Sequence, residues 1–307
     1  MRISFFIIIL TLLVSSCTSA GAGNRGDTSG NRIDCDSTEQ TNCDLPLDPF
    51  YNNEKADVAK INSALRKVSD ISDKNERVIA ATQEFIGTPY VGGTLNLPEK
   101  EQLYVNTDGL DCLTFVETVI ALSAAADSGQ PTLDDFLRKL RSIRYRDGKI
   151  EGYPSRLHYI SEWSTDNSRR GNFSEITEKC DHAVKKVKTI DYMTKNRQLY
   201  PALKDEEVFN AIRDNEAPLK DLHYSIIPTE SVDKAAKSFL KSGDIVAIVT
   251  ERPGLDVSHV GVVNIKNGVP YLIHASSKYK KVVNDTLPLR DYLKQQKSPG
   301  IRVFRLH

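Results

Sequence analysis

The sequence predicts an α+β fold in which helices come first and pack on a mainly antiparallel β-sheet. Apolar residues recur at helical spacing between residues 54 and 143, and short β-branched runs gather after residue 243. Two of those runs are joined by Asn267-Gly268, a dipeptide that favours tight hairpin turns. Helices followed by sequential strands are typical of α+β proteins. With 39% hydrophobic residues, the 307-residue chain has enough apolar material for a full core.

The first segment has the pattern of a secretory signal peptide, which we assign to residues 1–16. Met1-Arg2 is basic, residues 3–14 are almost wholly apolar, and small residues precede Cys17. The apolar run is too short to span a bilayer. A cysteine after small residues resembles a bacterial lipobox, which makes Cys17 the expected lipid attachment site. The alternative is an ordinary cleaved signal followed by a cysteine without a role.

We assign residues 17–53 to a lipidated, flexible tether and residues 54–307 to a single folded domain. The tether is rich in Gly, Ser, Thr, Asn and Asp and shows no periodicity. Its Cys35 and Cys43 either form a disulfide in an exported protein or remain thiols, and the sequence leaves both open. We expect an exported protein that acyl chains anchor to a membrane.

Four helices and four strands are predicted in the domain formed by residues 54–307. In the second helix apolar residues fall on one side, the third is apolar on most sides and so predicts burial, and the fourth is capped by Thr132. A glycine-containing loop covers residues 90–110, and a large helical insertion separates the third helix from the first strand. The predicted helices cover residues 54–69, 74–86, 112–124 and 132–143, and the predicted strands cover 245–249, 259–263, 271–274 and 301–306.

Composition excludes some classes of function. The chain has 41 basic and 41 acidic residues, and this neutral balance argues against a dedicated nucleic-acid-binding protein. No internal segment has the 18 or more apolar residues that a transmembrane helix needs.

Cys112 is the candidate nucleophile because of its position. It stands at the start of a predicted buried helix, where free N–H groups favour a thiolate and can bind a developing oxyanion. The alternative is a small apolar residue packed at a helix start. Two histidines weigh against that alternative: His259 begins one strand of the predicted hairpin and His274 ends the other, so they can lie side by side. A cysteine on a helix facing a histidine on a strand is the papain-type arrangement.

Short motifs in a fixed order carry a family resemblance. They are Gly87-Thr88-Pro89-Tyr90 with Gly92-Gly93, Asp111-Cys112, Gly243-Asp244, Ser258-His259-Val260-Gly261 and Ile273-His274-Ala275-Ser276. In this order they resemble the NlpC-type cell-wall cysteine peptidases, and the resemblance implies their papain-like fold.

The departures from the common NlpC pattern point to one branch of that superfamily. Leu113-Thr114-Phe115 stands where typical members have Ser-Gly-Phe, the loop before Cys112 is long, and the insertion contains Ser155 to Trp163. These features resemble the N-acetylmuramoyl-L-alanine amidase-like family. The resemblance implies hydrolysis of the bond between the lactyl group of N-acetylmuramic acid and L-alanine. It further implies peptidoglycan fragments, preferably anhydro-muropeptides, as partners, and a location facing the periplasm of a Gram-negative bacterium.

The resemblance also implies roles for the site residues. The Cys112 thiolate attacks the lactyl carbonyl, His259 transfers the proton to the leaving amine, and His274 orients His259. The Cys112 amide and the Tyr90 hydroxyl stabilise the oxyanion. Neither a cofactor nor a metal is expected.

The segment from Ser155 to Trp163 leaves two hypotheses open. If a helix starts at Pro154-Ser155, then Arg156, Tyr159 and Trp163 share one face and form a wall that binds sugar. Alternatively, these residues form a buried polar network that holds the insertion on the core. The residues predicted to bind substrate are Tyr90, Asp111, Ser155, Arg156, His158, Tyr159, Trp163 and Ser258.

Two rival functions remain. A γ-D-glutamyl-diaminopimelate endopeptidase of the cell wall would use the same Cys-His pair and differ only in its products. A non-enzymatic, muropeptide-binding lipoprotein would not need Cys112.

Overall fold

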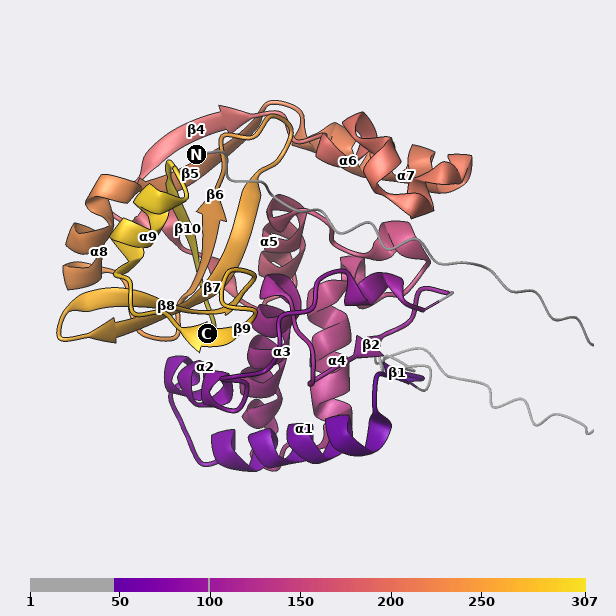
Figure 1. Cartoon of the computed structure of the whole chain (residues 1–307), viewed down its shortest axis with the longest axis horizontal. Helices are drawn as coiled ribbons and strands as arrows, with labels where there is room; N and C mark the ends of the chain where they lie inside the picture. Colours follow the sequence, from indigo (N-terminus) through magenta and orange to yellow (C-terminus); the bar gives the residue numbers. More distant parts are fainter. Residues whose placement is uncertain (1–46, 99) are drawn as a thin grey trace, which may run out of the picture. The chain divides into compact units, whose positions relative to one another are not determined.

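The computed structural model describes residues 47–98 and 100–307. The predicted signal peptide, Cys17, and the pair Cys35 and Cys43 lie outside these residues. The described part confirms the α+β class with a mainly antiparallel sheet (Figure 1).

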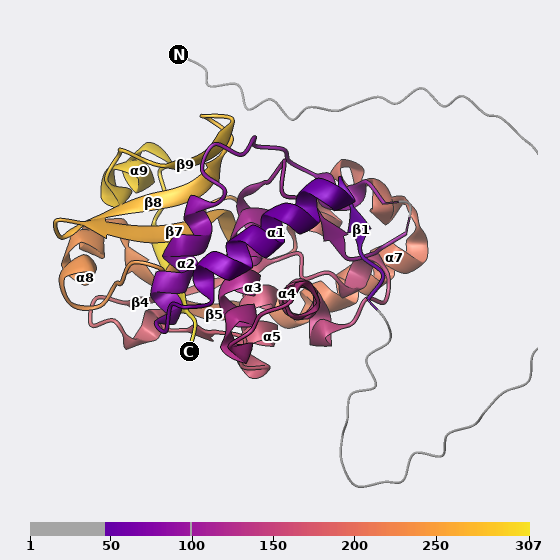
Figure 2. The same ribbon diagram turned by 90° about the horizontal axis from the view of Figure 1, so that it is seen from below.

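Helices form one layer of the folded domain. Each of the first four starts at a residue whose side chain accepts a hydrogen bond from the first turn: Asn53, Asp73, Asp111 and Thr132. The four predicted helices are confirmed, although the second ends earlier, in a turn that reaches Gly87. α1 runs across the ends of α3 and α4 (Figures 1 and 2). The helices of this layer are α1 (Glu54–Val68), α2 (Lys74–Gln83), α3 (Cys112–Ala125), α4 (Leu133–Arg144) and α5 (Ile160–Arg169).

The main sheet has eight strands in the order β4-β5-β10-β6-β7-β8-β9, with β3 paired to β10. The four predicted strands correspond to β6, β7, β8 and β10, while β3, β4, β5 and β9 were not predicted. Asn267 and Gly268 both have positive φ in the turn between β7 and β8, as a tight hairpin requires. The strands are β3 (Ser174–Glu175), β4 (Val184–Lys188), β5 (Leu222–Pro228), β6 (Ile245–Val249), β7 (Val257–Lys266), β8 (Val269–Ser276), β9 (Lys281–Asn284) and β10 (Gly300–Arg305).

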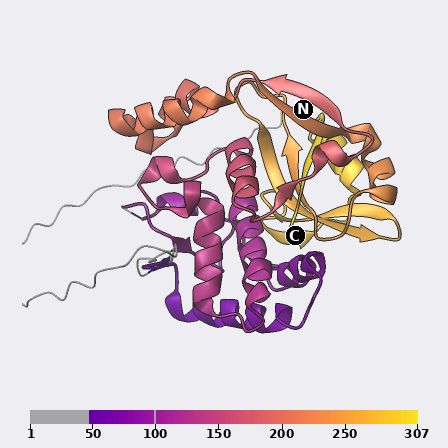
Figure 3. The ribbon, with the colours of Figure 1, turned by 180° about the vertical axis from the view of Figure 1, so that it is seen from behind.

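Both faces of the central strands are buried. On β6, Ile245 and Ala247 pack toward α1–α5, whereas Val246 and Ile248 pack toward α8 (Val232–Ser238) and α9 (Leu289–Gln295). This alternation follows from the period of two in a strand. Figure 3 shows the larger helical layer on one side of the sheet.

Gly243 allows α2 to approach the start of β6. Its φ is +88°, and a Cβ at this position would overlap the backbone of Asn75. The Gly243-Asp244 motif therefore has a structural reason, since Asp244 is fully buried and pairs with Arg305 at 2.6 Å.

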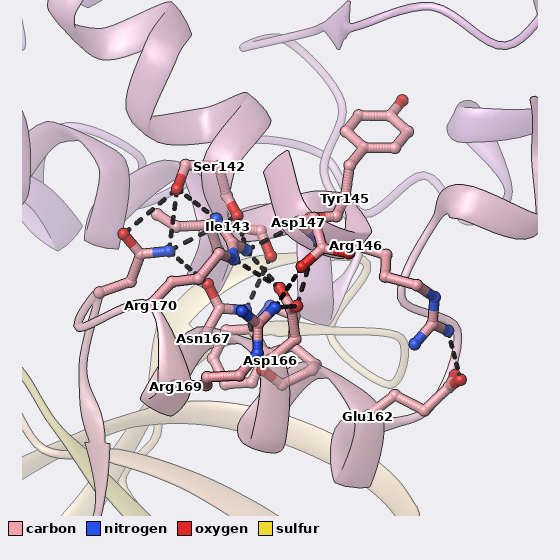
Figure 4. A network of polar contacts seen from close by, with 12 residues as sticks. Ser142, Ile143, Tyr145, Arg146, Asp147, Glu162, Asp166, Asn167, Arg169 and Arg170 are labelled. Carbon is pink, nitrogen blue, oxygen red and sulfur yellow. Dashed lines mark hydrogen bonds and ion pairs between the residues drawn. The ribbon is translucent and has the colours of Figure 1, made fainter. Parts of the chain in front are cut away.

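A polar network attaches α5 to the turn after α4 (Figure 4). Asp166 accepts from the Asp147 amide at 3.2 Å, and Asn167 Nδ2 donates to the carbonyl of Ile143 at 2.9 Å. Arg146 pairs with Glu162 at 2.6 Å. These bonds hold the start of the insertion on the helical layer.

Further along, the insertion forms an arm with its own small core. The arm contains α6 (Tyr192–Lys195) and α7 (Glu206–Glu216) and lies beside the sheet rather than on it (Figure 1). Its buried Met193, Leu203 and Ile212 pack together with Tyr159. The predicted helical insertion is therefore partly helical and partly the strands β3 to β5.

The folded region begins before residue 54. β1 (Phe50–Tyr51) pairs in parallel with β2 (Tyr104–Val105), so the end of the predicted tether belongs to the fold. Among the described residues, no helix combines the length and hydropathy required to cross a bilayer.

Candidate active site

Cys112 is the first residue of α3, and Asp111 fixes the start of that helix. The Asp111 carboxylate accepts from the Thr114 amide at 2.9 Å, and the Thr114 hydroxyl accepts from the Asp111 amide at 2.9 Å. This reciprocal capping box accounts for Asp111, which was predicted to bind substrate. Its carboxylate is used in positioning the nucleophile.

The thiol is protonated in the resting protein. Burial, followed by the charge of Asp111, raises the pKa of Cys112 to about 12, although the backbone amides of Val260, Leu113 and Cys112 oppose this. The helix N-terminus was expected to favour a thiolate; the amides of Cys112 and Leu113 do lower the pKa, but desolvation outweighs them. The same amides lie beside the sulfur, close to where the carbonyl oxygen of an attacked substrate would become an oxyanion.

The predicted histidine pair is confirmed in its geometry. His259 on β7 and His274 on β8 are linked by a bond of 2.6 Å between Nε2 and Nδ1, with the rings nearly perpendicular at 88°. Burial, followed by the neighbouring His274, lowers the pKa of His259 to about 3. Burial lowers the pKa of His274 to about 4. Both imidazoles are therefore neutral at neutral pH.

The backbone brings the thiol to this pair. Val260, whose amide bonds the Cys112 sulfur, is the residue after His259. A Cβ at Gly261 would meet the Leu272 side chain and the Ile273 carbonyl, so glycine lets β7 lie close to β8 here.

Two residues of this corner were missed by sequence reasoning. Tyr292 on α9 has its ring 6.3 Å from that of His259 and 5.4 Å from that of His274. Burial raises the pKa of Tyr292, and the charges of Asp285 and Cys112 add to this effect. Asp285, just after β9, has Oδ2 3.4 Å from His274 Nε2. Neither lies in a recognisable motif, since they depend on how the β9–α9 segment folds over the hairpin.

Tyr90 lies near Cys112, whereas Ser258, the residue before His259 on β7, donates from its hydroxyl to the Ile248 carbonyl at 3.4 Å. Tyr90 is half-buried, and its amide donates to the Lys280 carbonyl at 2.9 Å. Burial, followed by the charges of Cys112 and Asp111, raises the pKa of Tyr90. Its phenol is therefore a donor beside the thiol at neutral pH. Ser258 is exposed next to His259.

The polar residues of the insertion are occupied by partners within the chain. Ser155 donates to the Gly152 carbonyl at 2.7 Å, and Arg156 pairs with Glu101 at 2.7 Å. His158 Nε2 bonds the Tyr153 carbonyl at 3.0 Å, and burial lowers the pKa of His158 to about 3.

The predicted helix from Pro154 is wrong. Residues 153–155 form a 3-10 turn, Arg156 is extended, and α5 begins only at Ile160. Trp163 is 1% exposed, with its ring 4.3 Å from Phe173, so it has no face available for a sugar. The Tyr159 hydroxyl is likewise internal, and donates to Glu216 at 2.7 Å. For these residues the structure favours the buried polar network.

The corner combines a protonated thiol, a neutral base that can accept its proton, a second imidazole behind that base, and amides aimed at the sulfur. This set can perform nucleophilic acyl transfer. Within the described ranges, no group of three or more His, Cys, Asp or Glu side chains is placed to hold a metal ion.

Known proteins are similar to this chain in sequence and in fold. The model of the AmiA-like, N-acetylmuramoyl-L-alanine amidase-like family matches residues 80–301. An N-acetylmuramoyl-L-alanine amidase from Bacteroides uniformis is 35% identical with a TM-score of 0.71, over 76% of this chain and 99% of that one. No curated protein matches.

Two further structures are similar. A Bacteroides fragilis protein provisionally described as a xylanase is 38% identical with a TM-score of 0.70, over 73% of this chain and 98% of that one. A Legionella pneumophila protein, 24% identical with a TM-score of 0.59 over 83% of this chain and 96% of that one, shares the fold. The family model covers most of the domain that carries Cys112 and both histidines. The chain belongs to the N-acetylmuramoyl-L-alanine amidase-like family and is a cell-wall amidase in kind.

Proposed function

We propose that the protein hydrolyses the amide between the lactyl group of N-acetylmuramic acid and L-alanine, with Cys112 as nucleophile and His259 as base. The observation that carries this proposal is the thiol at the start of α3, bonded by the Val260 amide next to the His259–His274 pair. The family match supports the assignment of the bond that is cleaved, an amide between N-acetylmuramic acid and L-alanine. The order of these residues in the chain also supports a papain-like, NlpC-type fold.

The mechanism follows from the protonation states. Nε2 of His259 is bonded to His274, so Nδ1 of His259 is the atom left to accept the thiol proton. The sulfur attacks the lactyl carbonyl carbon as the proton leaves, and the amides of Cys112 and Leu113 together with the Tyr90 hydroxyl stabilise the oxyanion. The C–N bond then breaks, and the imidazolium of His259 gives its proton to the amine of L-alanine. Water, deprotonated by His259, hydrolyses the thioester and restores the thiol.

Glycoside hydrolysis fits this corner less well. Most glycosidases use two carboxyl groups that flank the scissile bond. Here Asp111 caps α3, and Asp285 is buried behind His274. The reactive groups that remain are a thiol and imidazoles, which favours acyl transfer.

We further propose that the substrates are anhydro-muropeptides, and that the protein acts at a periplasmic membrane surface through a lipid on Cys17. The first proposal rests on the family resemblance and the second on the basic, apolar and small-residue pattern of residues 1–17.

The test is a digest of defined disaccharide-peptides, in anhydro and reducing forms, read by mass spectrometry. Wild type is compared with Cys112→Ala and with the matched variant Cys180→Ala, which removes a buried thiol from the opposite face of the sheet. We expect free disaccharide and a peptide that begins with L-alanine, retained in Cys180→Ala and abolished in Cys112→Ala.

Each other result assigns a different function. Cleavage after D-glutamate would make the protein the endopeptidase of the rival hypothesis. Full activity in Cys112→Ala would refute the cysteine mechanism. Binding without cleavage by wild type would identify a muropeptide-binding lipoprotein.

A further inference from the structure

A buried carboxylate lies behind the histidine pair. Asp285 Oδ2 is 3.4 Å from His274 Nε2, and the two side chains are 2% and 1% exposed. The acid comes from the β9–α9 connection, whereas the imidazole comes from β8, so the fold brings together two groups distant from the nucleophile in sequence.

The turn around Asp285 holds its carboxylate in place. Oδ1 accepts from the Leu287 amide at 2.9 Å, and the Asp285 amide donates to the Leu272 carbonyl at 2.8 Å. In contrast, His274 Nε2 is buried and has no hydrogen-bond partner among the described residues. A buried N–H without an acceptor is costly. The Asp285 carboxylate comes within hydrogen-bond distance after a small rotation. It is therefore the acceptor available to His274 Nε2.

We propose that Asp285 is a positioning residue that keeps the proton of His274 on Nε2. His274 Nδ1 is then an acceptor, and it receives the Nε2 proton of His259 across the 2.6 Å bond. Nδ1 of His259 is left unprotonated as the base for the thiol. The proposal deepens the proposed function and rests on it, since it assigns the group that fixes the tautomers of both imidazoles.

The other titratable groups at this corner do not compete for that role. His259 comes from β7, Cys112 from α3, Tyr292 from α9, and Tyr279 from the β8–β9 turn. Burial raises the pKa of both Cys112 and Tyr292, so neither is charged at neutral pH. Asp285 thus lies behind His274, and His274 stands between it and the imidazolium that forms on His259 during attack.

The test uses Asp285→Asn in the full chain. The asparagine amide donates to His274 Nε2, so the proton of His274 moves to Nδ1. His274 Nδ1 then donates to His259 Nε2, and the proton of His259 moves to Nδ1, where it blocks the base. The readout is alkylation of Cys112 by iodoacetamide from pH 5 to 9, followed on the Cys112 peptide by mass spectrometry, because it needs no muropeptide. We expect alkylation to slow by about tenfold or more and muropeptide hydrolysis by about 10²–10⁴-fold.

Asp244→Asn is the matched control. It also removes a buried carboxylate charge, but one paired with Arg305 at the start of β6. We expect it to lower thermal stability and to leave alkylation unchanged. A folded Asp285→Asn chain that alkylates at the wild-type rate with the wild-type pH profile overturns the proposal. An equal loss in Asp244→Asn overturns it too. Asp285-dependent alkylation in a chain that cleaves no muropeptide would refute the proposed function and leave the role of Asp285 standing.

A second measurement reads the tautomer directly in the wild-type chain, and a variant is needed only to assign the signals. In the wild-type chain labelled with ¹⁵N-histidine, nitrogen shifts report the tautomer of His274, assigned by comparison with His274→Gln. A proton on Nε2 supports the proposal, and a proton on Nδ1 overturns it.

Discussion

At the scale of single residues, the reacting pair is neutral before substrate binds. The pKa of Cys112 is raised to about 12 and that of His259 is lowered to about 3, in both cases mainly by burial. A thiol with a neutral base must lose its proton during attack, whereas an ion pair has already lost it. Most of the nucleophilicity is therefore produced at the moment of reaction.

This protonation state has an optical test. We predict that the ultraviolet thiolate absorbance of wild type minus that of Cys112→Ala is absent at neutral pH and emerges only in strong alkali. In denaturant the same cysteine should titrate near its ordinary pKa of about 8.5. A thiolate signal from the folded chain at neutral pH would show that Cys112 and His259 rest as an ion pair.

At the scale of elements, the first turn of α3 couples stability to chemistry. Asp111→Ala removes the capping box, and we predict a loss of about 1 kcal/mol of unfolding free energy. It should also lower amidase activity, because Cys112 lies in the turn that the cap orders. Denaturant titration and the muropeptide digest measure the two effects.

Thr132→Ala is the matched variant for this prediction. It removes the capping box of α4, whose Thr132 and Asp135 make the same reciprocal bonds away from the thiol. We expect a similar loss of stability with activity retained. If both variants lose activity equally, the cap of α3 has no special role in the site.

The elements that local patterns mark were predictable, and those that depend on distant contacts were not. The caps at Asp73 and Thr132, the apolar α3 and the Asn267-Gly268 turn are readable from neighbouring residues. β4 has exposed residues on both faces, so its sequence lacks the alternation of a half-buried strand. Asp285 and Tyr292 join the site only through the fold of the β9–α9 segment. Arg156 and Trp163 were misplaced because periodicity does not reveal where α5 begins.

At the scale of the whole molecule, three neutral histidines with lowered pKa values make stability depend on pH. The pKa values of His158 and His259 are lowered to about 3 and that of His274 to about 4, against about 6.5 in an unfolded chain. Above that value all three are neutral in both states. As the pH falls below it, the unfolded chain binds protons that the folded chain resists, so the unfolding free energy decreases until the folded pKa values are reached.

We predict that the melting temperature falls between pH 7 and pH 4 and that His158→Gln makes this fall shallower. Glutamine still donates to the Tyr153 carbonyl but does not titrate. His223→Gln, whose imidazole is exposed on β5, is the control and should keep the wild-type slope. A slope unchanged in His158→Gln would show that His158 binds protons equally in the folded and unfolded states, and would refute the lowered pKa.

The place of β10 has a consequence for how the molecule is assembled over time. In chain order β10 follows every other strand, yet it lies between β5 and β6 and also pairs with β3. β10 thus joins the strands of the insertion to the strands that carry the histidines, and it is synthesised after both. Until residues 300–305 emerge, the nascent polypeptide has two unpaired sheet edges and no completed core between them. The two groups of strands therefore become one continuous sheet only when β10 has paired with β5 on one side and β6 on the other.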